Sequence, residues 1–189
     1  VILGNIAVLS QSSPVQVGTR SWTAVSAGGT HTAAIRSDNL LFAWGLNTNG
    51  QLGDGTTASK SSPIQVGSSS WTAVSAGNVH TAAIRSDGLL FTWGAGTNGR
   101  IGDNQSSFNR SSPVQIGIFS WTTISAGVTH NAAIRSDGAL FTWGFGTSGQ
   151  LGDGTAVTKS VPVTVGGGIV STLYTSPVQI GSSSWVAVS

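Results

Sequence analysis

The stretch that decides the fold is Ser21-Trp-Thr-Ala-Val-Ser-Ala-Gly28, which recurs as Ser70–Gly77 and, with Thr-Ile in place of Ala-Val, as Ser120–Gly127. Two further markers keep the same spacing of 49 and 50 residues: a histidine nine residues after each of these tryptophans, and a second tryptophan thirteen residues after each histidine. The three sets are Trp22, Trp71 and Trp121; His31, His80 and His130; and Trp44, Trp93 and Trp143. Because independent markers share one period, the chain is a tandem repeat of a unit of about 50 residues.

Each unit predicts four short β-strands. In the second unit, residues 71–75 and 80–86 have strand-like sequences, and Asp87-Gly88 predicts a two-residue hairpin turn into a third strand at residues 89–93. A fourth strand begins at Pro113, and we expect it at an outer edge because proline lacks the N–H that a central strand must donate. The Ser-Ala-Gly sequence after the first strand permits close approach of backbones near an axis.

The inner strands carry apolar residues on both faces, so each sheet must be covered on both sides. Sheets stacked around an axis meet this requirement. We therefore expect an all-β fold, a β-propeller of four-stranded antiparallel blades, with three complete blades and partial ends.

The repeat divides the sequence into consecutive segments. We place repeat 1 at residues 14–62, repeat 2 at 63–112 and repeat 3 at 113–161. Residues 1–13 are expected to be a lead-in or part of a preceding blade. An insertion at 162–176 interrupts the rhythm, and residues 177–189 begin a further repeat. Since the sequence does not begin with Met and ends within a repeat, we expect a fragment or a processed piece of a longer chain.

Composition excludes several kinds of site. The chain has 8 Lys and Arg, 6 Asp and no Glu, and its cations are scattered singly. Nucleic-acid binding needs clustered cations, so we expect no nucleic-acid partner. Without cysteine, neither a disulfide nor a thiolate metal site can form. The apolar run at residues 1–9 is too short to span a bilayer, so we expect no membrane span.

We interpret the repeated histidines and tryptophans as structural. Each histidine has the same place in its own unit, and the repeat keeps the three apart. We therefore expect buried histidines that bond a neighbouring backbone group rather than metal ligands. The aspartates also recur in turns and loops of every unit, unlike the paired carboxylates of an acid–base site. We expect no catalytic residue, no metal and no cofactor.

Positions at which the copies differ are the candidates for binding a partner. Repeat 2 has Arg100, Phe108 and Arg110, an aromatic side chain beside two arginines. Ile118 and Phe119 stand where the other copies have Ser-Ser or Thr-Arg, and Tyr174 lies in an apolar part of the insertion. The competing interpretation is neutral drift in surface loops.

The ordered motif Ser-Ala-Gly-x-x-His-Thr-Ala-Ala-Ile-Arg-Ser-Asp-Gly-x-Leu-Phe-Thr-Trp-Gly, followed by Gly-Gln-Leu-Gly-Asp-Gly-Thr and Pro-Val-Gln-Val, resembles the regulator of chromosome condensation repeat. The resemblance covers residues 11–165 and resumes at 177–189. It implies a seven-bladed ring, of which this chain supplies about half. Additional blades, from the parent chain or from a second copy, are then expected to close the ring.

The resemblance and the composition together lead to two functional hypotheses. The first is a non-enzymatic propeller module whose loops contact protein or glycan, in an exported bacterial surface protein or a phage virion component such as a fibre or decoration protein. Near-identical copies and an uncharged, Ser/Thr-rich surface favour this extracellular or virion-associated role. The alternative is an intracellular regulator, such as a guanine-nucleotide exchange factor for a small GTPase.

Overall fold

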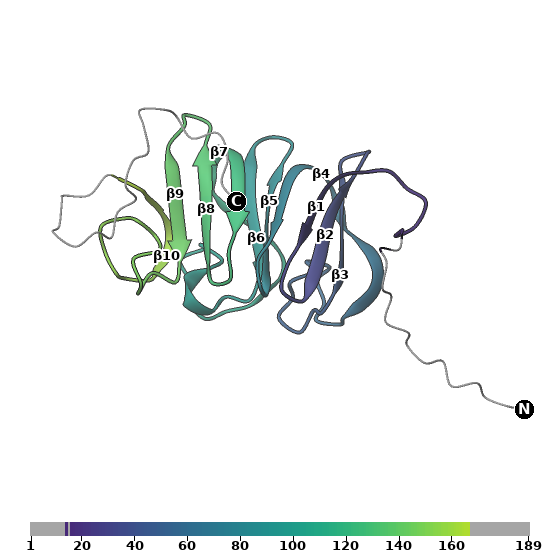
Figure 1. Cartoon of the computed structure of the whole chain (residues 1–189), viewed down its shortest axis with the longest axis horizontal. Helices are drawn as coiled ribbons and strands as arrows, with labels where there is room; N and C mark the ends of the chain where they lie inside the picture. The colour runs from purple at the N-terminus through teal and green to yellow at the C-terminus, as the bar shows by residue number, and fades with distance from the viewer. Residues whose placement is uncertain (1–13, 15, 167–189) are drawn as a thin grey trace, which may run out of the picture.

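The computed structural model describes residues 14 and 16–166, and these contain ten β-strands and one short 3-10 helix. The strands run in chain order across the molecule, from β1–β3 at one end to β8–β10 at the other (Figure 1). Their bounds are β1 Trp22–Ala27, β2 His31–Arg36, β3 Leu40–Gly45, β4 Lys60–Ala76, β5 His80–Arg85, β6 Leu89–Gly94, β7 Arg110–Ala126, β8 His130–Arg135, β9 Leu140–Gly144 and β10 Lys159–Thr164; the helix η1 is Thr97–Gly99.

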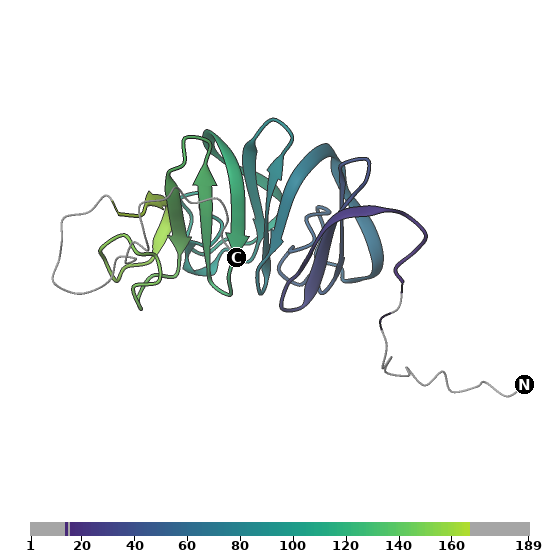
Figure 2. The same ribbon diagram turned by 45° about the horizontal axis from the view of Figure 1, so that its top comes forward.

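All neighbouring strands are antiparallel, and they form three four-stranded blades. Blade 1 consists of β1, β2, β3 and the first part of β4; blade 2 continues from the second part of β4 to the first part of β7; blade 3 continues from there to β10. The turned view shows the blades standing side by side (Figure 2). The predicted all-β fold with four-stranded antiparallel blades is confirmed.

The strands β4 and β7 each belong to two blades. In β4, Ile64 and Gln65 pair with β3, whereas residues from Trp71 onward pair with β5. The sequence predicted two separate short strands here. The structure has one continuous strand of 17 residues instead, which crosses to the next blade through a bulge between Gln65 and Ser70 where Gly67 has a φ of +61°.

The hydrophobic core lies between the blades. Successive residues of β5 point to opposite faces, as in any strand. Ala83 joins a cluster with Ile35 and Leu41 of blade 1, and Ala82 and Ile84 join a second cluster that continues into blade 3. A single blade therefore has no interior of its own, and stacking supplies the burial that stabilises the fold.

The innermost strands approach one another more closely than side chains would allow. A Cβ atom at Gly28 would lie 2.4 Å from the carbonyl oxygen of Gly77, and one at Gly77 would lie 2.6 Å from that of Gly127. Consistent with this contact, the Gly29 amide donates a hydrogen bond to the Gly77 carbonyl oxygen across 3.2 Å. Glycine after the first strand is thus a packing requirement of the blade-to-blade contact.

Each blade turns from its second to its third strand at an Arg–Asp pair. Arg36 binds Asp38, Arg85 binds Asp87, and the third blade repeats this pairing with N–O distances of 2.5–2.7 Å. The arginine hydrogen bond lowers the pKa of Asp38 to about 2. Within the described part of the chain, no helix is long and apolar enough to cross a membrane.

Candidate functional site

A buried hydrogen-bond network, here called the first latch, joins blade 1 to blade 2. Thr81 of blade 2 donates its hydroxyl hydrogen to the Gln51 carbonyl oxygen of blade 1 across 2.8 Å. The same carbonyl oxygen accepts a bond from Trp93 Nε1 across 3.0 Å. His31 Nε2 lies 2.7 Å from Thr81 Oγ1, and since that hydroxyl has already donated its hydrogen, His31 must be the donor.

The second latch repeats this arrangement between blades 2 and 3, with Asn131 in place of the threonine. His80 Nε2 lies 2.9 Å from Asn131 Oδ1, and Asn131 Nδ2 donates to the Arg100 carbonyl oxygen across 2.8 Å. Trp143 Nε1 donates to that same oxygen across 3.0 Å. The amide thus reproduces both the acceptor and the donor of the hydroxyl it replaces.

The latch histidines are neutral and structural. Burial lowers the pKa of His31 and of His80 to about 4. The expectation of a backbone partner was wrong, because each Nε2 meets a side chain of the next blade, and both Nδ1 atoms are buried without a partner. His130 has the matching place in blade 3, and burial lowers its pKa also.

The remaining repeated tryptophans pack against the phenylalanine of their own third strand. Trp22–Phe42, Trp71–Phe91 and Trp121–Phe141 make edge-to-face contacts with ring centroids 5.2–5.5 Å apart. The ring centroid of Trp44 lies 6.2 Å from that of Trp22, with the two rings tilted by 52°. These aromatic contacts are part of the scaffold in every blade.

Every aspartate of the sequence has a cationic partner. The 6 pairs are Arg36–Asp38, Lys60–Asp54, Arg85–Asp87, Arg110–Asp103, Arg135–Asp137 and Lys159–Asp153. Of the 8 Lys and Arg, only Arg20 and Arg100 are not in this set, and they account for the net charge of +2. The repeated ion pairs are therefore scaffold, and they leave no free carboxylate for acid–base chemistry.

The predicted patch of Arg100, Phe108 and Arg110 is not formed. Arg100 is only 5% exposed; it donates to the Thr97 carbonyl oxygen across 2.9 Å and to the Val128 carbonyl oxygen of blade 3 across 3.3 Å. Arg110 is held by Asp103 at 2.6 Å, as lysines are at the equivalent positions of the other repeats. Phe108 alone is exposed, so the two arginines have structural roles, contrary to the prediction.

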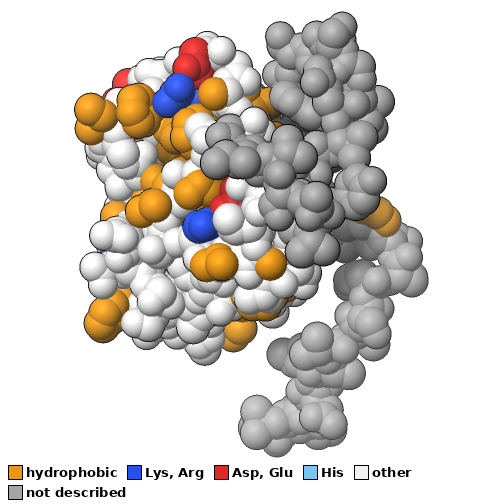
Figure 3. Space-filling model, turned by 90° about the vertical axis from the view of Figure 1, so that its left-hand side faces the viewer, with side chains coloured by type: hydrophobic (Ala, Val, Ile, Leu, Met, Phe, Trp, Pro, Cys, Tyr) orange, Lys and Arg blue, Asp and Glu red, His pale blue; other side chains and the backbone are white. Residues whose placement is uncertain are grey.

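Ile118 and Phe119 do lie on the surface, with 83% and 52% of their area exposed. Phe119 stands at a cavity of about 200 Å³, here called the blade 3 hollow, whose other walls include Trp121, Phe141 and Val161. The Arg135 guanidinium carbon lies 4.9 Å from the ring centroids of both Phe119 and Phe141. The space-filling view of this end of the molecule shows several separate groups of hydrophobic side chains and only a few charged ones (Figure 3).

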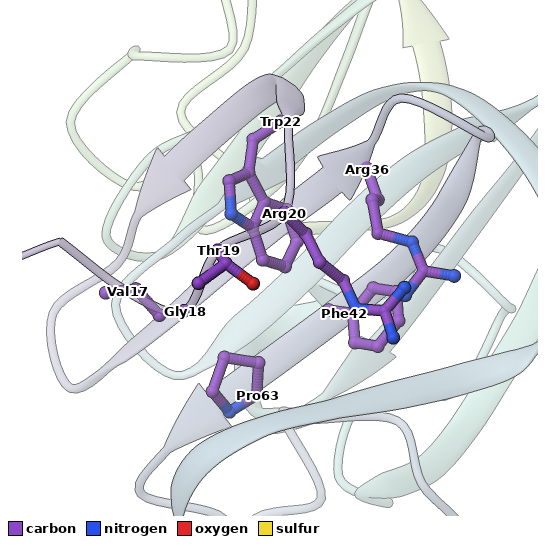
Figure 4. Close-up of a pocket in the computed structure, with 8 residues that line it drawn as sticks. All are labelled: Val17, Gly18, Thr19, Arg20, Trp22, Arg36, Phe42 and Pro63. Carbon is purple, nitrogen blue, oxygen red and sulfur yellow. The ribbon is translucent and has the colours of Figure 1, made fainter.

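The equivalent positions of blade 1 form a second cavity, the blade 1 hollow, of about 280 Å³. Arg20 takes the place of Phe119, and Thr19 that of Ile118. Figure 4 shows Arg20, Arg36 and Phe42 among the residues that line this hollow. The complete lining is Val17, Gly18, Thr19, Arg20, Trp22, Arg36, Phe42 and Pro63.

Two rim residues were missed at the level of sequence. Arg20 differs from its counterparts Ser69 and Phe119, but it is not among the candidates for binding named from the sequence. Val161 is also absent from the candidates, although the other copies have Ser62 and Ser112 at this position. A position-by-position comparison of the copies identifies both. Tyr174 lies outside the described residues.

A third, open cavity of about 250 Å³ lies where the innermost strands end. Its walls are glycine and alanine with Asn78 and Val128, so it offers mainly backbone. In the described ranges no three His, Cys, Asp or Glu side chains gather as metal ligands would. At the two hollows, side chains that differ from the repeat lie beside a cavity and face solvent.

Comparisons with known proteins agree with this architecture. The family model of the regulator of chromosome condensation (RCC1) repeat matches residues 38–84, 87–134 and 137–188. A second model of the same repeat matches residues 22–51, 71–100 and 121–150. No curated protein matches the chain significantly in sequence.

Solved structures show the same fold at low sequence identity. Human WBSCR16 is 23% identical with a TM-score of 0.72, and the match covers 82% of this chain and 40% of that one. Prp20p from Saccharomyces cerevisiae is 24% identical with a TM-score of 0.71, covering 78% and 39% of the two chains. The chain thus spans less than half the length of these structures. With the repeat models matching most of its length, the chain belongs to the regulator of chromosome condensation (RCC1) repeat family.

Proposed function

We propose that the chain is a non-enzymatic binding module whose blade hollows contact a protein or a glycan. The observation that carries this proposal is where the copies differ. The latches and ion pairs recur from blade to blade, whereas the rim positions change from Thr19-Arg20 to Ser68-Ser69 to Ile118-Phe119 and face solvent. Exposed apolar and arginine side chains beside a cavity are typical of binding surfaces.

An exported bacterial surface protein or a phage virion component is the setting that we propose for this module. The support is compositional: charged residues make up 7% of the chain, and its surface is built mainly from Ser, Thr, Asn, Gln and Gly. Detection of the parent protein on intact cells or purified particles, with a cytoplasmic enzyme as the control, tests the setting. Its recovery only in the cytoplasmic fraction would contradict it.

The binding role is tested by screening the full chain against immobilised glycans and purified candidate proteins, together with the double variant Arg20→Ser/Phe119→Ser. Blade 2 has serine at this position, so the substitutions copy a residue that the scaffold already carries. We expect a bound partner that the double variant no longer binds although it remains folded, with only a small change in thermal stability. Binding that survives both substitutions would contradict the use of the hollows.

The alternative is a guanine-nucleotide exchange factor for a small GTPase. The related Prp20p has been studied for its binding to Gsp1p and histones. At 24% identity this likeness supports only a shared fold. Accelerated nucleotide release from a panel of small GTPases by the full-length parent protein would favour this alternative over the surface module.

A further inference from the structure

We propose that the blade 1 hollow binds a carboxylate-bearing sugar, a hexuronic acid unit of a glycan. This inference rests on the proposed binding function and names the ligand class of one of its two hollows. It depends on the charge of Arg20, the flat apolar walls around it and the shape of the hollow when a neighbouring blade is present.

The ion pairs of the chain leave Arg20 without a carboxylate partner. All 6 aspartates are held by other cations, so no side-chain carboxylate of the chain is left for Arg20. The other cation outside these pairs, Arg100, is buried and bonded to carbonyl oxygens. Arg20 is exposed at the rim of the hollow and is therefore the one position where an external anion meets an uncompensated charge.

The neighbouring Arg36 leaves the hollow with a single excess charge. Its guanidinium binds Asp38 at 2.6 Å and lies 4.6 Å from the centroid of Phe42. A ligand with one negative charge thus balances the site. A guanidinium fork fits the two oxygens of a carboxylate.

The walls suit a ring that is apolar on its faces and polar at its edges. Trp22 and Phe42 are half-buried and meet edge to face at 5.5 Å, and Pro63 stands opposite them (Figure 4). The Thr19 hydroxyl is directed into the same space (Figure 4). A pyranose ring presents C–H faces to such walls and hydroxyl groups to Thr19. An acidic peptide would use the arginine but not this combination.

The hollow does not depend on the absence of a preceding blade. In blade 3 the equivalent cavity has an additional wall at Gly102, in a loop of the blade before it, and it remains open at about 200 Å³. Phe119, the counterpart of Arg20, is 52% exposed there. A blade stacked before blade 1 would therefore leave Arg20 accessible.

Titration calorimetry of the full chain with an oligogalacturonate, and with its neutral counterpart in which hydroxymethyl replaces each carboxylate, tests the proposal. We expect binding of the acidic form only. Arg20→Ser should weaken it by about tenfold or more, and Arg20→Lys by less, because lysine keeps the charge without the fork. Val157→Ser, which changes an exposed apolar side chain outside both hollows, is the control and should leave the affinity unchanged.

Equal binding of the neutral oligosaccharide, or unchanged affinity of Arg20→Ser, would overturn the proposal. Binding of a glutamate-containing peptide, but neither sugar, would overturn the sugar assignment and identify an acidic peptide as the ligand. The binding-module proposal fails separately, when the full chain binds nothing in the screen that includes the Phe119 surface.

Discussion

The latches between the blades and the hollows at their rims are built from the same repeat, but they differ in how their residues vary from copy to copy. In the latches, a change of residue preserves the bonding pattern, as when Asn131 replaces the threonine and still bonds both the histidine and the carbonyl oxygen. At the rims, Arg20 and Phe119 occupy equivalent positions with opposite chemistry. The comparison indicates that the stacking of the blades constrains the residues of the latches, whereas it does not constrain those at the rims.

The physical reason is that a substitution lowers the free energy of unfolding by different amounts in the two regions. A latch group is buried, so an unpaired donor or acceptor there loses its bond to water without a replacement. A rim side chain is in contact with solvent and can change at little cost to stability. The four predictions below test this contrast.

The largest expected loss of stability follows from removing a tryptophan that belongs both to the hydrophobic core and to the first latch. Trp93 is fully buried and donates to the Gln51 carbonyl oxygen. Trp93→Ala should lower the free energy of unfolding by about 3–5 kcal/mol. Denaturant unfolding measures this, and the half-buried counterpart Trp44→Ala is the control that should cost less. If both variants lost the same free energy of unfolding, the contact between blades would not contribute to stability at this position.

The next effect is the dependence of stability on pH. The pKa of His31 and of His80 is about 4 in the folded chain, below the ordinary value of 6.5. Between these values the unfolded chain binds protons that the folded chain does not. Stability should be highest above pH 6.5 and fall toward pH 4, by at most about 3 kcal/mol per histidine.

The melting temperature from pH 7.5 to pH 4 measures this dependence. His80→Gln, whose amide can still donate to Asn131, should reduce the slope. A melting temperature that stays constant down to pH 4.5 would contradict the assignment of neutral, buried latch histidines. Asp38 titrates at about pH 2 and so does not contribute in this range.

A smaller effect separates bonding from volume in the first latch. Thr81→Val should cost about 1–3 kcal/mol of unfolding free energy, because the Gln51 carbonyl oxygen and His31 Nε2 both lose a partner in a buried site. Thr81→Asn copies the second latch and should cost clearly less. If the two variants unfold at the same denaturant concentration, the latch bonds do not stabilise the stacking.

The smallest effect on stability is expected at the rims. Arg20→Ser and Phe119→Ser should each change the free energy of unfolding by no more than about 1 kcal/mol, since both side chains are largely in solvent and serine occupies this position in blade 2. Thermal unfolding of the two variants beside the wild type measures this. A loss as large as that of Trp93→Ala would make the rims part of the scaffold.

The blade architecture could be predicted because the repeat reports it several times over. Period, turn signals and the apolar character of both strand faces recur in every unit, so the strand order and the burial of His80 and Trp93 follow from the pattern. The partner of each latch histidine could not be predicted. It lies about 50 residues away on the next blade, and only the stacking geometry brings the pair together.

The binding candidates were harder for a related reason. Arg100 and Arg110 differ from other copies in residue type, but a long arginine side chain can turn inward to satisfy carbonyl oxygens or an aspartate, and both do so. The aliphatic side chain of Ile118 cannot form hydrogen bonds or ion pairs of this kind, and it stays exposed. Sequence difference thus identified variable positions, while burial in the folded chain decided which of them face solvent. The repeat boundaries at residues 62 and 112 stay predictions.

The strands β4 and β7 have a mechanical consequence. Each is hydrogen-bonded at one end within one blade and at the other end within the next, with only a bulge at Gly67 or Gly117 between the two halves. A pulling force applied along the array is therefore carried by backbone ladders loaded in series. Peeling one blade from its neighbour frays the sheets on both sides, which favours extension in coupled steps over the release of blades one by one.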